Sequence, residues 1–260
     1  MSVFTDKWID EHKDELVEKL QQCVRINSVR DDGSTREGAP FGEGAAKCLE
    51  DTLNTAKEMG FEVKNLDGYC GTVDYGTGEE QLGILAHLDV VPEGEGWTYP
   101  PYAAEIQDGR LYGRGTMDDK GPAFAALFGL AAVKASGVET KRRVRLILGC
   151  DEECGMGCLH HYNEVEKAPD MCFSPDASYP LVNSEKMIYN SAYRKEYASS
   201  VRVKAGTVSN AVPGKAEVFV PVSADEVKAA VAKLNNADFT YNVSAADNGA
   251  NVVITGIAAH

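Results

Sequence analysis

Long apolar runs, basic charge and closely paired cysteines are all scarce in this sequence. No stretch approaches the roughly 20 consecutive apolar residues of a membrane-spanning helix, and residues 1–20 are charged and amphipathic rather than an apolar signal core. Asp and Glu number 40 against 26 Lys and Arg, which leaves a net charge of −14. We therefore expect a cytoplasmic protein with no membrane partner and no nucleic-acid partner, because phosphate binding needs concentrated Lys and Arg.

The cysteines and the length set further limits. The seven cysteines are an odd number, none of them paired as CxxC, so we interpret them as reduced thiols and do not expect a structural cysteine zinc site. The 260 residues can form one large core, or one domain with part of another.

The stretch that organises the chain is residues 82–97, LGILAHLDVVPEGEGW. Its apolar start predicts a buried strand, which Pro and Gly then end. His87 and Asp89 are two residues apart, so we expect both on one face at the carboxyl end of this strand, where open α/β sheets place ligands. The pair can hold a metal, or it can be a core histidine satisfied by an aspartate.

The segments around this strand alternate between helical and strand patterns. They predict helices at 4–24, 44–59 and 121–138 and further strands at 61–66, 71–75, 142–149 and 171–173. Asp67-Gly68 and Asp108-Gly109 are hairpin-turn signals. The alternation indicates an α/β domain over residues 1–187, with a largely parallel sheet and flanking helices. Residues 188–260 read strand, strand, helix, strand, strand, which predicts part of a smaller α+β domain.

Three further segments place carboxylates beside strand ends. They are Asp118-Asp119 before the third helix, Asp151 to Glu153 after the strand at 142–149, and Asp176 after the strand at 171–173. Any one of them alone can be a helix cap or a turn residue. Together with the histidine they form a nitrogen and oxygen ligand set that suits zinc, manganese or cobalt, with more carboxylates than one metal uses. We infer a two-metal site, in which a bridging hydroxide attacks a carbonyl.

Four motifs then carry a resemblance: HLDVVPEGEGW, YGRGTMDDKGP, DEECG and SPDASYP, in this order over about residues 80–190. They resemble the di-zinc family of aminoacylases, carboxypeptidase G and related dipeptidases. The DDKGP and SPDASYP segments are most similar to its dipeptidase V and carnosinase-like branch, which cleaves dipeptides with a free amino terminus. The resemblance implies a zinc exopeptidase-like fold, a partial lid domain over 188–260, and two Zn²⁺ ions, with Mn²⁺ or Co²⁺ as substitutes.

The same resemblance implies the metal ligands. His87 and Asp176 would bind one zinc, Glu153 would bind the other, and Asp118 would bridge both. Family members carry a cis peptide after the bridging aspartate, which predicts one between Asp118 and Asp119.

Catalytic roles also follow from the resemblance. Asp89 would orient the His87 imidazole, and Glu152 would take a proton from the metal-bound water and pass it to the leaving amine. Residues 256–260, GIAAH, match a lid motif whose histidine, here His260, would stabilise the oxyanion. The family continues beyond this motif and supplies the last histidine ligand of the second zinc there, so we expect that position to lack a ligand. Asn210 matches a family segment, but we assign it no role.

The function expected from the sequence is that of a zinc-dependent dipeptidase. A deacylase or carboxypeptidase acting on N-acyl amino acids, or an inactive metal-binding fragment, are the alternatives. The expected partner is a small peptide substrate, and an oligomer is possible.

Overall fold

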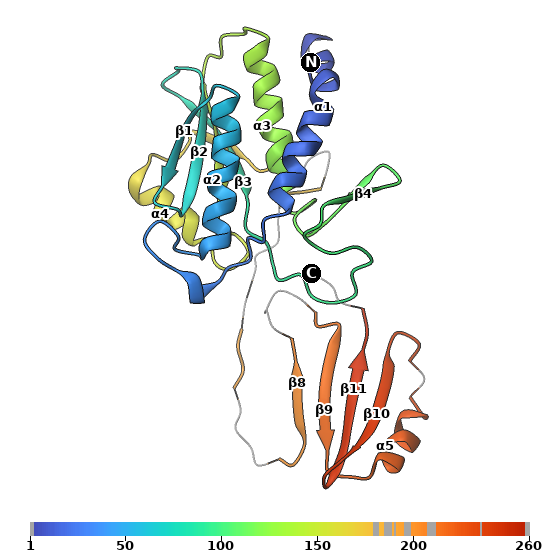
Figure 1. Cartoon of the computed structure of the whole chain (residues 1–260). Helices are drawn as coiled ribbons and strands as arrows, with labels where there is room; N and C mark the ends of the chain where they lie inside the picture. The colour runs from blue at the N-terminus through green and yellow to red at the C-terminus, as the bar shows by residue number, and fades with distance from the viewer. Residues whose placement is uncertain are drawn as a thin grey trace. The chain divides into compact units, whose positions relative to one another are not determined.

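The computed structural model describes residues 3–178, 182–184, 189, 191–194, 199–206, 212–234 and 236–257. The chain forms two compact units, Met1–Glu185 and Lys186–His260. Figure 1 traces both from the N-terminus to the C-terminus. Among the described residues, none of the helices has the length and apolar character that crossing a bilayer requires.

In the first unit, helices alternate with strands. Its described helices are α1 (Val3–Val24), α2 (Glu43–Glu58), α3 (Lys120–Ala135) and α4 (Gly157–Val165), with a 3-10 turn η1 (Asp32–Ser34). Its described strands are β1 (Glu62–Leu66), β2 (Cys70–Tyr75), β3 (Gln81–His87), β4 (Glu105–Gln107), β5 (Arg110–Tyr112), β6 (Arg143–Gly149) and β7 (Met171–Phe173). These bounds confirm the predicted helices and strands. Helix α4 was not predicted, because its N-cap residue is Met156, which is in the left-handed conformation and makes no side-chain capping hydrogen bond. The usual sequence signal for a helix start is therefore missing.

The main sheet has the strand order β1-β2-β6-β3-β7 and is mixed. Its parallel pairs are β3 with β6 and β3 with β7, whereas β2 pairs with both β1 and β6 in the antiparallel direction. The antiparallel part follows from the β1–β2 hairpin, whose turn residues Asp67 and Gly68 have φ of 55° and 77°. Asp108 and Gly109 turn the β4–β5 hairpin in the same way, with φ of 51° and 72°. The α/β class is confirmed, and within the described main sheet parallel strand pairing is confined to β6, β3 and β7.

The core of the first unit lies between the sheet and its helices. Gly71 of β2 brings the sheet close to α2, because a Cβ at this position would lie 2.9 Å from the side chain of Leu49. On the other face, Arg145 of β6 donates a hydrogen bond to the hydroxyl of Tyr162 in α4, at 3.2 Å. Figure 1 shows α1, α2 and α3 together on one side of the sheet, with α4 apart from them.

The second unit contains a four-stranded antiparallel sheet in the order β10-β11-β9-β8. Its described elements are β8 (Arg202–Ala205), β9 (Lys215–Val220), α5 (Ala224–Val231), β10 (Thr240–Ala246) and β11 (Gly249–Thr255). Their order confirms the predicted pattern of strand, strand, helix, strand, strand. Ser223 caps α5 in a reciprocal capping box with Glu226. Asn210 and His260 lie outside the described residues.

Candidate metal centre

His87 is the buried centre of the site. It ends β3, and its side chain is only 3% exposed. Its Nδ1 lies 2.9 Å from the main-chain oxygen of Asp89. With Nδ1–H donating to that carbonyl, Nε2 is the nitrogen that can bind a metal once it has lost its proton, which is the usual arrangement of a metal-binding histidine.

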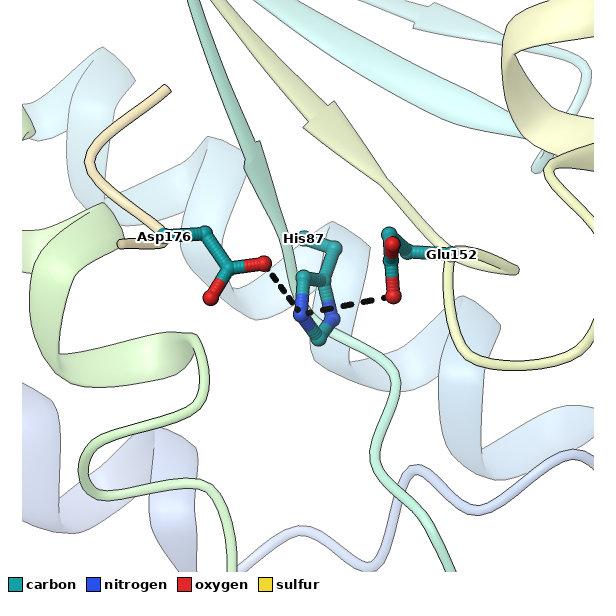
Figure 2. A group of neighbouring side chains, drawn as sticks. All are labelled: His87, Glu152 and Asp176. Atoms are coloured by element: carbon teal, nitrogen blue, oxygen red, sulfur yellow. Dashed lines mark ion pairs between the residues drawn. The ribbon is translucent and has the colours of Figure 1, made fainter. Parts of the chain in front are cut away.

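Three carboxylates surround Nε2 of His87. The nearest oxygens of Asp118, Asp176 and Glu152 lie 3.0, 3.5 and 3.9 Å away from it. Figure 2 shows the imidazole between Asp176 and Glu152, with each carboxylate coming from a different segment. The parallel pairing of β6, β3 and β7 brings in two of the carboxylates, because His87 lies opposite Gly149, Glu152 follows β6 and Asp176 follows β7. Asp118 comes from the loop before α3.

Among the residues that the structure describes, the side chains form two groups that could hold a metal ion. His87, Glu152 and Asp176 form one, and His87, Asp118 and Glu153 form the other; within each group the ligand atoms lie within 4.8 Å of one another. All four ligands predicted from the sequence are thus brought together. Glu152, predicted as a general base, lies beside them and also offers an oxygen.

The electrostatics of the site favour a cation. Burial disfavours charge on the His87 imidazole, but hydrogen bonds to Asp118 and Asp89 and the nearby charge of Asp119 outweigh it and raise the pKa of His87 to about 12. Burial, reinforced by the neighbouring carboxylates, raises the pKa of Glu152. Several carboxylates crowded round one imidazole are stabilised when positive charge lies between them.

The carboxylate of Asp89 holds the turn after β6. Its two oxygens accept the backbone N–H groups of Glu152 and Glu153, each at 3.1 Å, and the residue is 1% exposed. The resemblance assigns Asp89 to the orientation of the imidazole. In the structure Nδ1 of His87 lies 2.9 Å from the main-chain oxygen of Asp89 and 3.5 Å from its Oδ1, and the same carboxylate also accepts the N–H groups of both glutamates.

Asp119 was noted in the sequence only as half of an acidic pair. It is fully buried, and its Oδ2 accepts the backbone N–H of His87 at 3.0 Å. The peptide bond between Asp118 and Asp119 is cis, which confirms the expectation from the resemblance. Asp118 contacts the imidazole of His87, while Asp119 contacts the backbone of the strand that carries it. The adjacent acidic pair was the available signal for this second role.

Comparison with known proteins places the chain in a family. Residues 83–254 match the model of peptidase family M20/M25/M40. The chain belongs to this family.

Two curated relatives support the placement of this M20/M25/M40 chain. One is YtjP of Bacillus subtilis, a protein named as a dipeptidase. It is 41% identical over 216 residues, which are 80% of this chain and 47% of that protein. The Beta-Ala-Xaa dipeptidase of Lactobacillus delbrueckii subsp. lactis is 35% identical over 261 residues, which are 95% of this chain and 55% of that protein. The M20/M25/M40 chain thus spans about half the length of these relatives.

Among solved structures, human carnosine dipeptidase 1 is similar with a TM-score of 0.52 and 26% identity, over 62% of this chain and 37% of that chain. An M20 family metallo-carboxypeptidase from Sulfolobus solfataricus has a TM-score of 0.51 at 22% identity, which supports the fold alone. These matches confirm both the resemblance seen in the sequence and the fold of the M20/M25/M40 chain.

Proposed function

We propose that this chain is the metal-binding catalytic part of a zinc-dependent dipeptidase. The observation that carries the proposal is the convergence of one buried imidazole and four carboxylates at the carboxyl ends of β3, β6 and β7. The names of the relatives support dipeptides as substrates. The two compact units support a catalytic domain over residues 1–187 and part of a lid over 188–260.

The residues present fit divalent metal ions. Imidazole nitrogen and carboxylate oxygens, with no thiolate among them, suit zinc, manganese or cobalt. We expect His87 and Asp176 to hold one ion, Glu153 to hold a second, and Asp118 to contact both. When bound, such ions polarise a carbonyl and lower the pKa of water.

Glu152 is the residue we propose as general base and acid. Its side chain is 35% exposed, and burial raises the pKa of its carboxyl group, which is the direction of change that suits a carboxyl group acting as acid and base. It takes a proton from the attacking water and returns it to the leaving amine. Asp89 keeps Glu152 in place through the backbone N–H bond. We propose His260 as the oxyanion donor on the resemblance alone.

Space for a substrate lies directly beside these groups. A cavity of about 210 Å³ has His87, Glu152 and Asp176 in its wall. Apolar side chains, among them Leu85 and Leu159, line much of the rest, together with Ser174. We propose that a small peptide binds there with its scissile carbonyl near His87.

The test compares the full chain with Glu152→Gln and Asp118→Asn, using Glu164→Gln on the exposed surface of α4 as the matched control. Bound zinc is measured per chain, and hydrolysis is followed for a free dipeptide and for an N-acetyl amino acid. We expect Glu152→Gln to keep its zinc and lose at least about 100-fold in turnover, the usual contribution of general acid–base catalysis. We expect Asp118→Asn to lose zinc and Glu164→Gln to match the native chain.

Each other outcome has a definite meaning. Hydrolysis of the N-acetyl amino acid alone identifies a deacylase. Zinc binding without any turnover is the result that the alternative of an inactive metal-binding fragment predicts. Turnover retained by Glu152→Gln refutes the role given to that residue.

A further inference from the structure

We infer that Arg30 is a positioning residue for the Glu152–Glu153 turn, acting through Asp151. Arg30 lies between α1 and α2, and none of the sequence motifs of the site contains it. The inference rests on the proposed function, because its consequence is measured at the proposed metal centre.

The contact itself is direct and partly buried. Nη1 of Arg30 donates to Oδ1 of Asp151 at 2.8 Å across 121 positions of the sequence. The Asp151 side chain is 2% exposed, whereas that of Arg30 is 35% exposed. Nε of the same guanidinium donates to Asp32 at 2.8 Å, and the group lies 5.5 Å from the ring centroid of Phe41. Two further contacts, with Asp32 and with the ring of Phe41, thus hold Arg30 besides the one with Asp151.

Asp151 closes the turn that carries both glutamates. Its Oδ2 accepts the backbone N–H of Gly157 at 3.0 Å, and its main-chain oxygen accepts that of Met156 at 2.7 Å. Asp151 thereby joins the two ends of the turn, with Glu152 and Glu153 between them. A buried carboxylate that loses its cationic partner is costly, so we expect the turn to shift when Arg30 is removed.

The segment carrying Arg30 is also attached to the other half of the site. Val29 bridges Val90 in the parallel direction, and the hydroxyl of Ser28 donates to the main-chain oxygen of Leu88 at 2.6 Å. Leu88 lies between His87 and Asp89. The segment Ser28–Arg30 therefore contacts the chain next to His87 and also the turn that carries Glu152 and Glu153. An ion pair isolated on the surface makes no such connection.

The experiment is a Co²⁺ titration of the full 260-residue chain, followed by visible absorption, for the native protein, Arg30→Met and Arg30→Lys. Arg36→Met is the matched control, because Arg36 comes from the same loop and pairs with Glu43 on the exposed surface. We expect Arg30→Met to weaken Co²⁺ binding by about tenfold or more and to change the absorption bands, as loss of a ligand-supporting contact does. Arg30→Lys keeps the charge but not the planar fork, so we expect a loss of several-fold. Arg36→Met is expected to match the native chain.

Thermal unfolding of each variant separates positioning from simple loss of the fold. Arg30→Met with native affinity and native absorption overturns the inference. If Arg30→Met does not fold, Arg30→Lys decides, and native affinity in that variant overturns the inference equally. A native chain that binds no Co²⁺ overturns the proposed function and this inference together, whereas binding that is insensitive to Arg30 overturns only the inference.

Discussion

Replacing Asp89 by Asn tests how the glutamate turn is held. The carboxylate accepts two backbone N–H bonds at 3.1 Å in a residue that is 1% exposed, and the amide offers one oxygen and one donor in their place. One N–H, of Glu152 or Glu153, then faces an NH₂ group. Because hydrogen bonds to charged groups contribute about 1.5–3 kcal/mol, we expect Asp89→Asn to lower the free energy of unfolding by about 2 kcal/mol. We also expect zinc affinity to fall by about 10–100-fold.

Urea unfolding in the presence of a chelator measures the stability change, and zinc titration of the folded protein measures the affinity. Asp170→Asn is the control, because Asp170 also accepts a backbone N–H, that of Gln81 at 2.8 Å, but in an exposed position. We expect a smaller stability change there. If Asp89→Asn has the same urea midpoint of unfolding as the native chain and binds zinc as tightly, the two N–H bonds do not hold the turn.

Three further outcomes are expected. Arg145→Met removes the partner of the buried Asp74 carboxylate, which Nε and Nη2 contact at 2.8 and 2.9 Å, and is expected to cost about 3–5 kcal/mol in urea unfolding. Hydrogen bonds from Lys64 and Arg145 lower the pKa of Glu166 in the folded protein. The ionised group therefore stabilises the fold at pH values above its ordinary pKa of 4.5, and this stabilisation is lost as the pH falls through the lowered pKa of the folded state. Acid unfolding of Glu166→Gln is therefore expected to depend less on pH in that range. With a thiol reagent, we expect the native chain to react first at its two exposed cysteines, Cys154 and Cys172.

Much of the fold was predictable because its signals are local. The two Asp-Gly turns and the apolar periodicity identify their elements without any knowledge of distant contacts. The ligand set was predictable for a related reason. Parallel strands end at one edge of a sheet, so the polar residues placed just after β3, β6 and β7 had to meet. Asp118, on the loop before α3, was assigned to the site by the resemblance.

The remaining features depend on contacts that no local pattern contains. The path of the turn after β6 depends on Met156, a residue without glycine's freedom that nevertheless has a φ of 61°. That path decides that the Asp89 carboxylate points at backbone N–H groups. Arg30 and Asp151 are separated by 121 positions, and nothing in the sequence of either segment indicates the other.

The strand order has a consequence for local unfolding. β3, which carries His87, is paired on both sides, whereas β7 is a three-residue strand at the edge of the described sheet, held through Leu82 to Ile84. In hydrogen-exchange measurements, the amides of β3 are expected to exchange only when the whole unit unfolds. Those of β7 are expected to exchange through local fraying, which needs less free energy. Asp176 therefore depends on the weakest strand of the site, and a cation held by both His87 and Asp176 would slow exchange in β7 by mass action.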